Sequence, residues 1–240
     1  MGKLFDLDSP VMRAINKVAD LMGLNFLVIL CSLPIVTAGA AITAGHYVAL
    51  KLVRDEESYI IKNFFKAFKQ NFRQSTVIWV IILVGLSVLG YDFYLINHSE
   101  VLENPDVLWM LMMAVTVLLS FFLVWVFPLQ AKFDNPVSRT IKNAFGMALI
   151  KFPRSLAMVI CYITPWLAAY YITQSIPFMI LLGVSGPMYL SALIYNKEFK
   201  NIEDRILERI AKEKGAEEDS NTEDEDRIFS DTLTINETER

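Results

Sequence analysis

The chain has 240 residues, of which 54% are hydrophobic, and its mean hydropathy is +0.41. These values lie above those of ordinary water-soluble domains and exclude a purely soluble globular protein. The formal net charge of −4 is unevenly distributed, because ten carboxylates follow Gly215 and the rest of the chain is mildly basic.

Four stretches contain no Asp, Glu, Lys or Arg, and they are 30, 18, 25 and 42 residues long: 21–50, 74–91, 107–131 and 155–196. One crossing of a bilayer needs about 20 mainly apolar residues, so the last stretch is long enough for two. The sequence therefore predicts an all-α fold, a polytopic transmembrane helical bundle with five or six membrane segments within residues 1–214. The expected segments are about 10–33, 38–53, 74–96, 107–131, 155–173 and 177–196.

The first stretch is ambiguous, because it is interrupted near its middle by Pro34 and Gly39. Proline removes a backbone donor and clashes with the preceding turn, so a helix commonly kinks or ends there. A single crossing would place the basic residues of 1–20 outside the cell. Two short helices that fold back at Pro34 would keep every Lys and Arg inside, and we favour this hairpin.

The connections between the apolar stretches differ in charge. Six basic residues lie in 51–73 and five in 132–154, whereas 92–106 contains none. Lys and Arg of short loops stay in the cytoplasm, so the second and third stretches should cross in opposite directions and the fourth should turn outside. The sequence thus predicts a multi-pass protein of the cell membrane with both termini cytoplasmic.

A short repeat links the two basic connections. The sequence IKNFF at 61–65 returns 80 residues later as IKNAF at 141–145, and at the same offset Phe72 and Ser75 match Phe152 and Ser155. Apolar residues recur with helical spacing in both copies. The pattern predicts two cytoplasmic amphipathic helices at the membrane interface, about 58–72 and 137–152.

These two helices form the candidate functional surface. Basic amphipathic helices beside a membrane bury aromatic side chains in the headgroup layer and extend Lys to anionic phosphates, so anchoring is one interpretation and docking of a cytoplasmic partner is the other. In the first copy, the expected apolar face consists of Ile61, Phe65, Phe68 and Phe72. Replacing Phe64 by Leu is expected to change little, because most apolar area remains. The candidate docking or membrane-interface residues are Lys62, Phe65, Lys66, Phe68, Lys69, Phe72, Arg73, Lys142, Phe145 and Phe152.

Residue types for catalysis or ion coupling are missing from the apolar stretches. His46 is the candidate for ion coupling there, and we expect it to be an interfacial hydrogen-bonding side chain. The apolar stretches and inner loops contain no acidic dyad, metal-ligand spacing or Gly-rich phosphate loop. The sequence therefore predicts no enzyme activity, cofactor, metal site or nucleic-acid partner. Helix breaks at Pro165, Pro177, Gly183 and Gly186-Pro187 could instead line a cavity for a neutral ligand.

The C-terminal part is more polar. A charged helix is expected at about 198–214, with a narrow apolar stripe of Phe199, Ile202, Ile206 and Ile210. Residues 215–240 are rich in Glu, Asp, Ser, Thr and Asn, which predicts a disordered acidic tail.

Several segments carry a resemblance to a known family. LPIVTAGA at 33–40, YVALKLVR at 47–54 and NFFKAFKQNF at 63–72 resemble the YesL-like family of bacterial integral membrane proteins. FPLQA at 127–131 and IKNAF at 141–145 are similar to its second conserved block, so the resemblance covers roughly residues 1–210. It implies a multi-pass protein of unestablished activity, often encoded beside carbohydrate ABC importers and sensor kinases in Gram-positive bacteria. It implies no catalytic or binding residues.

Two functions follow as expectations. The first is a non-catalytic accessory or regulatory membrane subunit associated with carbohydrate ABC import or its signalling. Its partners would be the lipid bilayer and a membrane protein, either the importer or a sensor kinase. The alternative is a small-solute (sugar) permease that acts through a central cavity formed by the helix breaks.

Overall fold

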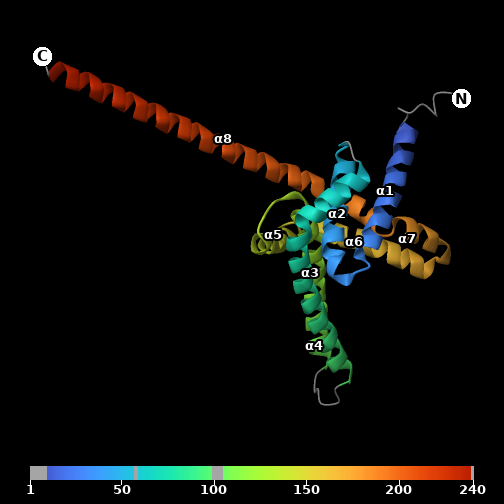
Figure 1. The fold of residues 1–240 in the computed structure, drawn as a ribbon. Coiled ribbons are helices and arrows are strands. Elements are labelled where there is room, and N and C mark those ends of the chain that lie inside the picture. The colour runs from blue at the N-terminus through green and yellow to red at the C-terminus, as the bar shows by residue number, and fades with distance from the viewer. Residues whose placement is uncertain (1–9, 57–58, 99–104, 239–240) are drawn as a thin grey trace. The chain divides into compact units, whose positions relative to one another are not determined.

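The computed structural model describes residues 10–56, 59–98 and 105–238, with side chains described as far as Lys214. All regular structure in these ranges is helical (Figure 1). In chain order the helices are α1 (Pro10–Ser32), the 3-10 turn η2 (Ile35–Thr37), α2 (Ala38–Val53), α3 (Ile60–His98), α4 (Pro105–Lys132), α5 (Val137–Ile150), α6 (Phe152–Tyr171), the 3-10 turn η3 (Thr173–Ser175), α7 (Ile176–Leu182) and α8 (Ser185–Thr238). The chain divides into two compact units, Met1–Tyr195 and Asn196–Arg240.

Within these described ranges, five helices are long and apolar enough to cross a membrane. They are Val11–Ser32, Ile35–Val53, Ile60–His98, Asp106–Lys132 and Phe152–Tyr171. A sixth crossing exists if Thr173–Leu182 and Ser185–Lys214, which meet at a bend of 67°, count as one broken span. The predicted all-α architecture is confirmed, and the apolar helices are those of a membrane protein.

The first apolar stretch folds back on itself at η2. Two contacts show that α1 and α2 are antiparallel. The Lys17 ammonium lies 2.6 Å from a carboxylate oxygen of Asp55, just beyond the end of α2. Nearer the turn, a Cβ atom added to Gly45 would lie 2.9 Å from Val28 Cγ2. The backbone of Pro34 is extended, with φ −75° and ψ 113°, so the helix ends before it as the sequence predicts.

Helix α2 occupies the centre of the first unit and packs against α1, α3 and α4. Its buried face consists largely of Ala, Gly and Thr, which allow backbones in a membrane to approach closely. A Cβ atom on Gly39 would lie 2.5 Å from Trp79 Cβ of α3, so no larger residue fits there without displacing that helix. The Trp79 indole also donates a hydrogen bond to the Ile35 carbonyl at 2.7 Å, which ties α3 to the turn before α2.

Helix α3 combines two segments that were expected to be separate. The amphipathic segment at 58–72 and the membrane segment at 74–96 form one helix of 39 residues, although the expected start at 58 lies outside the described residues. In the second copy of the repeat, the corresponding chain is divided at Lys151 into α5 and α6. The sequence explains the difference, because Pro153 stands where the first copy has Arg73. Proline cannot donate to an upstream carbonyl and is favoured in the first turn of a helix, as here in α6.

The repeat extends to the packing of the side chains. Three pairs related by 80 residues are buried in both copies: Phe64 and Ala144, Ser75 and Ser155, Ile78 and Met158. Two aromatic pairs are exposed in both copies: Phe65 and Phe145, Phe72 and Phe152. Each buried serine bonds to the helix that precedes its copy of the repeat, since Ser75 Oγ lies 2.9 Å from Thr43 Oγ1 of α2 and Trp125 of α4 donates to Ser155 Oγ at 2.8 Å. The two copies therefore resemble each other in packing as well as in sequence.

The segment predicted at 177–196 is divided into α7 and the start of α8. The break is bridged by Asn25 of α1. Its amide nitrogen donates to the Ile180 carbonyl at 2.8 Å, and its amide oxygen accepts from the N–H groups of Val184 and Ser185 at 2.9 and 3.0 Å. One buried amide thus satisfies backbone groups that a helix end leaves without partners.

The second unit is the continuation of α8 from Asn196. Helical backbone continues to Thr238, so the helix predicted at 198–214 has no separate end, and the segment predicted to be disordered is drawn as helix. Residues 208–218 are rich in Ala, Glu and Lys, which are strong helix formers and account for the absence of a break at Gly215. Disorder of 215–240 stays a prediction, and residues 239–240 lie outside the described residues.

Candidate functional site

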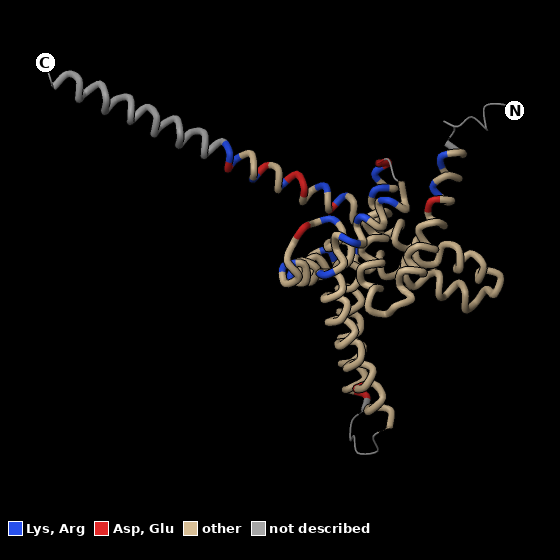
Figure 2. Tube along the Cα trace, in the orientation of Figure 1, with Lys and Arg blue, Asp and Glu red and all other residues tan. Residues whose placement is uncertain are grey.

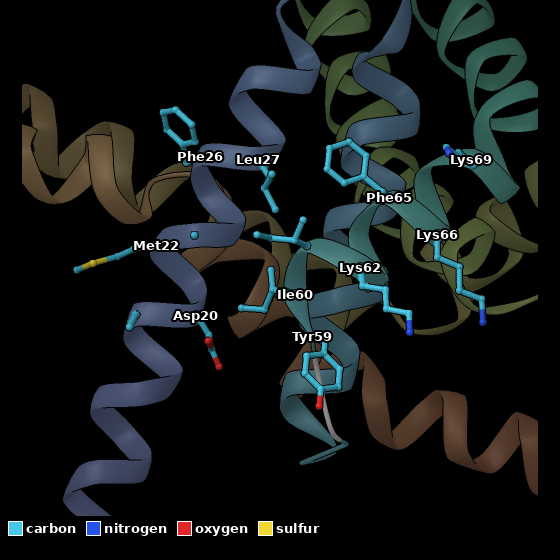
Figure 3. Close-up of a pocket in the computed structure, with 13 residues that line it drawn as sticks. Asp20, Met22, Phe26, Leu27, Tyr59, Ile60, Lys62, Phe65, Lys66 and Lys69 are labelled. Atoms are coloured by element: carbon cyan, nitrogen blue, oxygen red, sulfur yellow. The ribbon is translucent and has the colours of Figure 1, made fainter.

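An open groove lies between α1 and the first turns of α3 (Figure 3). Its volume is about 1200 Å³. The wall on α1 consists of Ala19, Asp20, Met22, Gly23, Phe26 and Leu27. The opposite wall includes Tyr59, Ile60, Lys62, Phe65, Lys66 and Lys69. The groove therefore combines an apolar wall with a basic one.

The packing of the two helices leaves this groove open. Helix α1 buries Leu21, Leu24, Asn25 and Val28 at helical spacing, so Phe26 on another face remains 69% exposed. Helix α3 buries Phe64 and Ala67. Each helix turns its buried face to the bundle, and the residues next to these faces form the groove walls.

The basic wall is exposed and carries more positive than negative charge. Lys62, Lys66 and Lys69 are exposed, and Asp20 is the one carboxylate among the lining residues. The described ion pairs, Lys17 with Asp55 and Lys51 with Glu56, do not involve these three lysines. Figure 3 shows Leu27 and Asp20 of α1 and Ile60 of α3 between the two helices, whereas Met22 and Phe26 extend from the outer side of α1 and Lys62 and Lys66 extend away from α1.

The structure brings four of the ten predicted site residues together in this groove: Lys62, Phe65, Lys66 and Lys69. Phe68, Phe72 and Arg73 lie further along α3 and are not among the lining residues. Lys142, Phe145 and Phe152 belong to α5 and α6, where Phe145 packs near Phe122 and Phe152 contacts Phe121 edge to face. A docking role for these ten residues stays a prediction.

Phe64 packs on the bundle and lies outside the expected apolar face of the first amphipathic helix, and the contact of that face with lipid stays a prediction. Phe64 is fully buried, whereas Ile61, Phe65 and Phe72 are 65%, 41% and 40% exposed. The repeated segment carries apolar residues on more than one face. A membrane helix can pack on protein with one face and contact lipid with another. Spacing alone therefore could not identify the face that packs on the bundle.

Sequence reasoning missed the α1 wall of the groove altogether. Met22, Phe26 and Leu27 belong to an apolar stretch that was interpreted only as a membrane segment. The sequence offered only a weak signal, because α1 carries apolar side chains on all faces. The polar Asn25 alone indicates the side that packs on α7 and α8.

His46 is a hydrogen-bonding side chain, as the sequence led us to expect, and it is buried among the helices. It is 2% exposed and belongs to a polar cluster of α2, α6 and α8. The Tyr162 hydroxyl lies 3.0 Å from Nε2, and the Tyr195 hydroxyl lies 3.4 Å from Nδ1. Tyr162 also reaches Ser191 Oγ at 3.4 Å. Both ring nitrogens thus have hydroxyl partners, which is the usual way to accommodate a buried imidazole.

A second polar cluster joins α3, α4 and α5 around Gln130. This residue is 2% exposed. Its amide nitrogen lies 2.6 Å from Gln74 Oε1 and 3.3 Å from Asn71 Oδ1, and its amide oxygen accepts a hydrogen bond from Thr140 at 3.0 Å. Polar side chains that bond across helices hold membrane bundles together. The Gln130 cluster therefore joins α3, α4 and α5 to one another.

The helix breaks of the last hairpin do line a cavity, but it is small and apolar. Its volume is about 290 Å³, and Pro165, Gly183, Gly186 and Pro187 are among its lining residues. Apolar side chains such as Phe178 and Leu190 cover much of the remainder. Sugar recognition needs several convergent hydrogen-bonding groups, which this lining offers poorly.

Comparison with known proteins gives one match. Residues 21–93 match a family model described as "Protein of unknown function, DUF624". The match covers less than half of the chain and extends from α1 through most of α3. It contains the first block of the YesL-like resemblance, 33–72, and excludes the second, 127–145. No curated protein and no solved structure matches the chain.

Proposed function

We propose that this protein is a non-catalytic accessory or regulatory subunit of the cell membrane, acting beside a carbohydrate ABC importer or its signalling machinery. The observation that carries the proposal is the polar interior of the bundle. In the clusters around His46 and Gln130, side chains of different helices hydrogen bond to one another. A transport path or an active site needs polar groups that stay free for a substrate, so bonded clusters favour a structural role.

The distribution of charge supports a cytoplasmic partner. In the first unit, the Lys and Arg residues of α2, α3 and α5 gather at one end of the helices, whereas the far part of α3 and α4 carries almost none (Figure 2). We assign the basic end to the cytoplasm, because Lys and Arg are enriched in short cytoplasmic loops. Together with the antiparallel hairpin of α1 and α2, this assignment leads us to propose a cytoplasmic N-terminus.

The surface that we assign to the partner is the exposed side of α5. Arg139 and Lys142 are exposed there, and Phe145 is 49% exposed. The link to carbohydrate import rests on the resemblance to the YesL-like family. The match to a family of unknown function over 21–93 is compatible with it.

Affinity purification from the native membrane tests the proposal. Tagged wild-type protein should co-purify with an importer subunit or a sensor kinase, and the charge-reversal variant R139E/K142E should lose that partner. The matched control K200E/K212E makes the same charge change at exposed lysines of α8 and should retain it. Purification of correctly inserted wild-type protein without any such partner would contradict the accessory role.

A sugar permease is the second candidate, favoured by the cavity at the helix breaks. Liposomes that contain only this protein would take up labelled oligosaccharide with saturable kinetics if it were a permease. We expect no uptake above that of protein-free liposomes. Saturable uptake would replace the accessory proposal with the permease.

A further inference from the structure

The groove between α1 and α3 brings together the two surfaces that a phospholipid requires. Its α1 wall carries Met22, Phe26 and Leu27, and it continues into the charge-free stretch 21–50. Its α3 wall carries Lys62, Lys66 and Lys69. Lysine beside an apolar membrane surface extends its ammonium group to the headgroup layer, where the phosphates lie.

We propose that this groove binds one anionic phospholipid, with its acyl chains along the α1 wall and its phosphate held by the three lysines of α3. Charge complementarity favours this occupant. The lining residues carry three ammonium groups and one carboxylate, Asp20, and within the described ranges the lysines form no ion pair. Clusters of basic residues at the cytoplasmic surface attract anionic headgroups, which a zwitterionic lipid matches less well.

The shape of the groove agrees with a chain-bearing ligand. Its volume of about 1200 Å³ is above the roughly 300–1,000 Å³ of ordinary small-molecule sites. Gly23 lies on the α1 wall, and a Cβ atom added there would meet nothing within 4 Å. This free space on the apolar wall is where an acyl chain would lie, and it permits a variant that fills the groove without disturbing the backbone.

Native mass spectrometry of the full-length, delipidated protein tests the proposal. The probes are phosphatidylglycerol and phosphatidylcholine with identical acyl chains. Wild type should bind one phosphatidylglycerol in preference to phosphatidylcholine. The variant K62Q/K66Q/K69Q should bind phosphatidylglycerol at least about tenfold more weakly, since each basic residue contributes appreciably near an anionic surface. The variant G23F should weaken binding of both lipids, because it occupies the space of the acyl chain.

Two matched controls separate the groove from general effects of charge and bulk. K200Q/K212Q/K214Q removes the same charge at exposed lysines that do not line the groove, and G85F adds a phenyl ring at another open glycine of a membrane helix. Both should bind phosphatidylglycerol like wild type. Equal binding of the two lipids by wild type, or unchanged binding by G23F, would overturn the proposal. So would loss of a co-purifying protein from the triple-lysine variant with lipid preference intact, because a protein would then occupy the groove.

Discussion

Phe64 and Phe65 are neighbours in the chain but have opposite environments. Phe64 is fully buried, and its ring lies 5.6 Å from that of Phe65 in an edge-to-face contact. Phe65 is 41% exposed and lines the groove. A substitution at Phe64 therefore acts on the packing of α3, whereas one at Phe65 acts on the groove.

Phe64→Ala should destabilise the protein by about 3 kcal/mol, because it leaves a cavity in a packed interior. Phe65→Ala should cost much less, since lipid or detergent can take the place of its ring. Titration with a denaturing detergent, followed by circular dichroism, measures both. Phe64→Leu, which the sequence suggested to be neutral, should now fall between the two. Equal stability of Phe64→Ala and Phe65→Ala would refute the burial of Phe64.

Asn25 bridges the break between α7 and α8 through three hydrogen bonds. Asn25→Leu keeps the branching and the number of side-chain heavy atoms but leaves two N–H groups and one carbonyl without this partner. Each unsatisfied buried group costs about 1–3 kcal/mol, so Asn25→Leu should lower the free energy of unfolding by more than a typical surface substitution does. Hydrogen exchange of the Val184 and Ser185 amides should accelerate strongly, while exchange in α3 stays at the wild-type rate. Unchanged exchange at these two amides would show that the amide bridge contributes nothing.

The Lys17–Asp55 ion pair joins α1 to the segment after α2, at the end of the hairpin away from the turn. The Lys17 ammonium donates a hydrogen bond to Asp55 and thereby lowers the pKa of that carboxyl from its usual 3.8. Because the pKa of Asp55 is lowered in the folded state, the pair stabilises the protein fully at pH values above the ordinary pKa of the carboxyl. This stabilisation is lost as the pH falls through the lowered pKa of the folded protein. The stability difference between wild type and Asp55→Asn should thus vanish in acid. It should also shrink in high salt, because the pair is largely exposed.

At the scale of the helices, one difference between the two copies of the repeat determines whether the helix is continuous: Arg73 in the first copy and Pro153 in the second. Arg73→Pro introduces into α3 the proline that divides α5 from α6. Proline in a helix interior costs about 3 kcal/mol relative to alanine, so this variant should be strongly destabilised. Arg73→Ala serves as the control and should be close to wild type. Thermal unfolding in detergent distinguishes them, and wild-type stability of Arg73→Pro would mean that the continuity of α3 has no role in folding.

The sequence predicted the helices well and their faces poorly. Charge-free stretches locate α4 and α6 within a few residues, because a membrane segment needs length and lack of charge more than a pattern. Pro34 indicated the hairpin turn because proline ends a helix through its own backbone geometry, whatever the surrounding fold. The burial of Phe64 and His46 and the position of α1 beside the first turns of α3 depend on contacts between distant segments, which a local pattern does not encode.

For the whole molecule, the proposed orientation can be tested with introduced cysteines. Cys31 and Cys161 are free thiols and are replaced by serine first. Cysteine at Ser9 or Ser220 should resist a membrane-impermeant thiol reagent in intact cells, whereas cysteine at Ser99 should react. All three should react in permeabilised cells. Labelling at Ser9 without permeabilisation would place the N-terminus outside.

The length of α3 has a consequence for its fit to the bilayer. At 1.5 Å per residue its 39 residues follow a path of roughly 58 Å, longer than the roughly 40–45 Å of a bilayer with its headgroups. The excess must be taken up by tilt, by curvature or by protrusion from the membrane. The far end of α3 meets α4 where the rings of Phe93 and Trp109 are in contact, so the excess length belongs to the lysine-bearing first turns. In the second copy of the repeat the chain is divided at Lys151, and α6 alone has the length of one crossing.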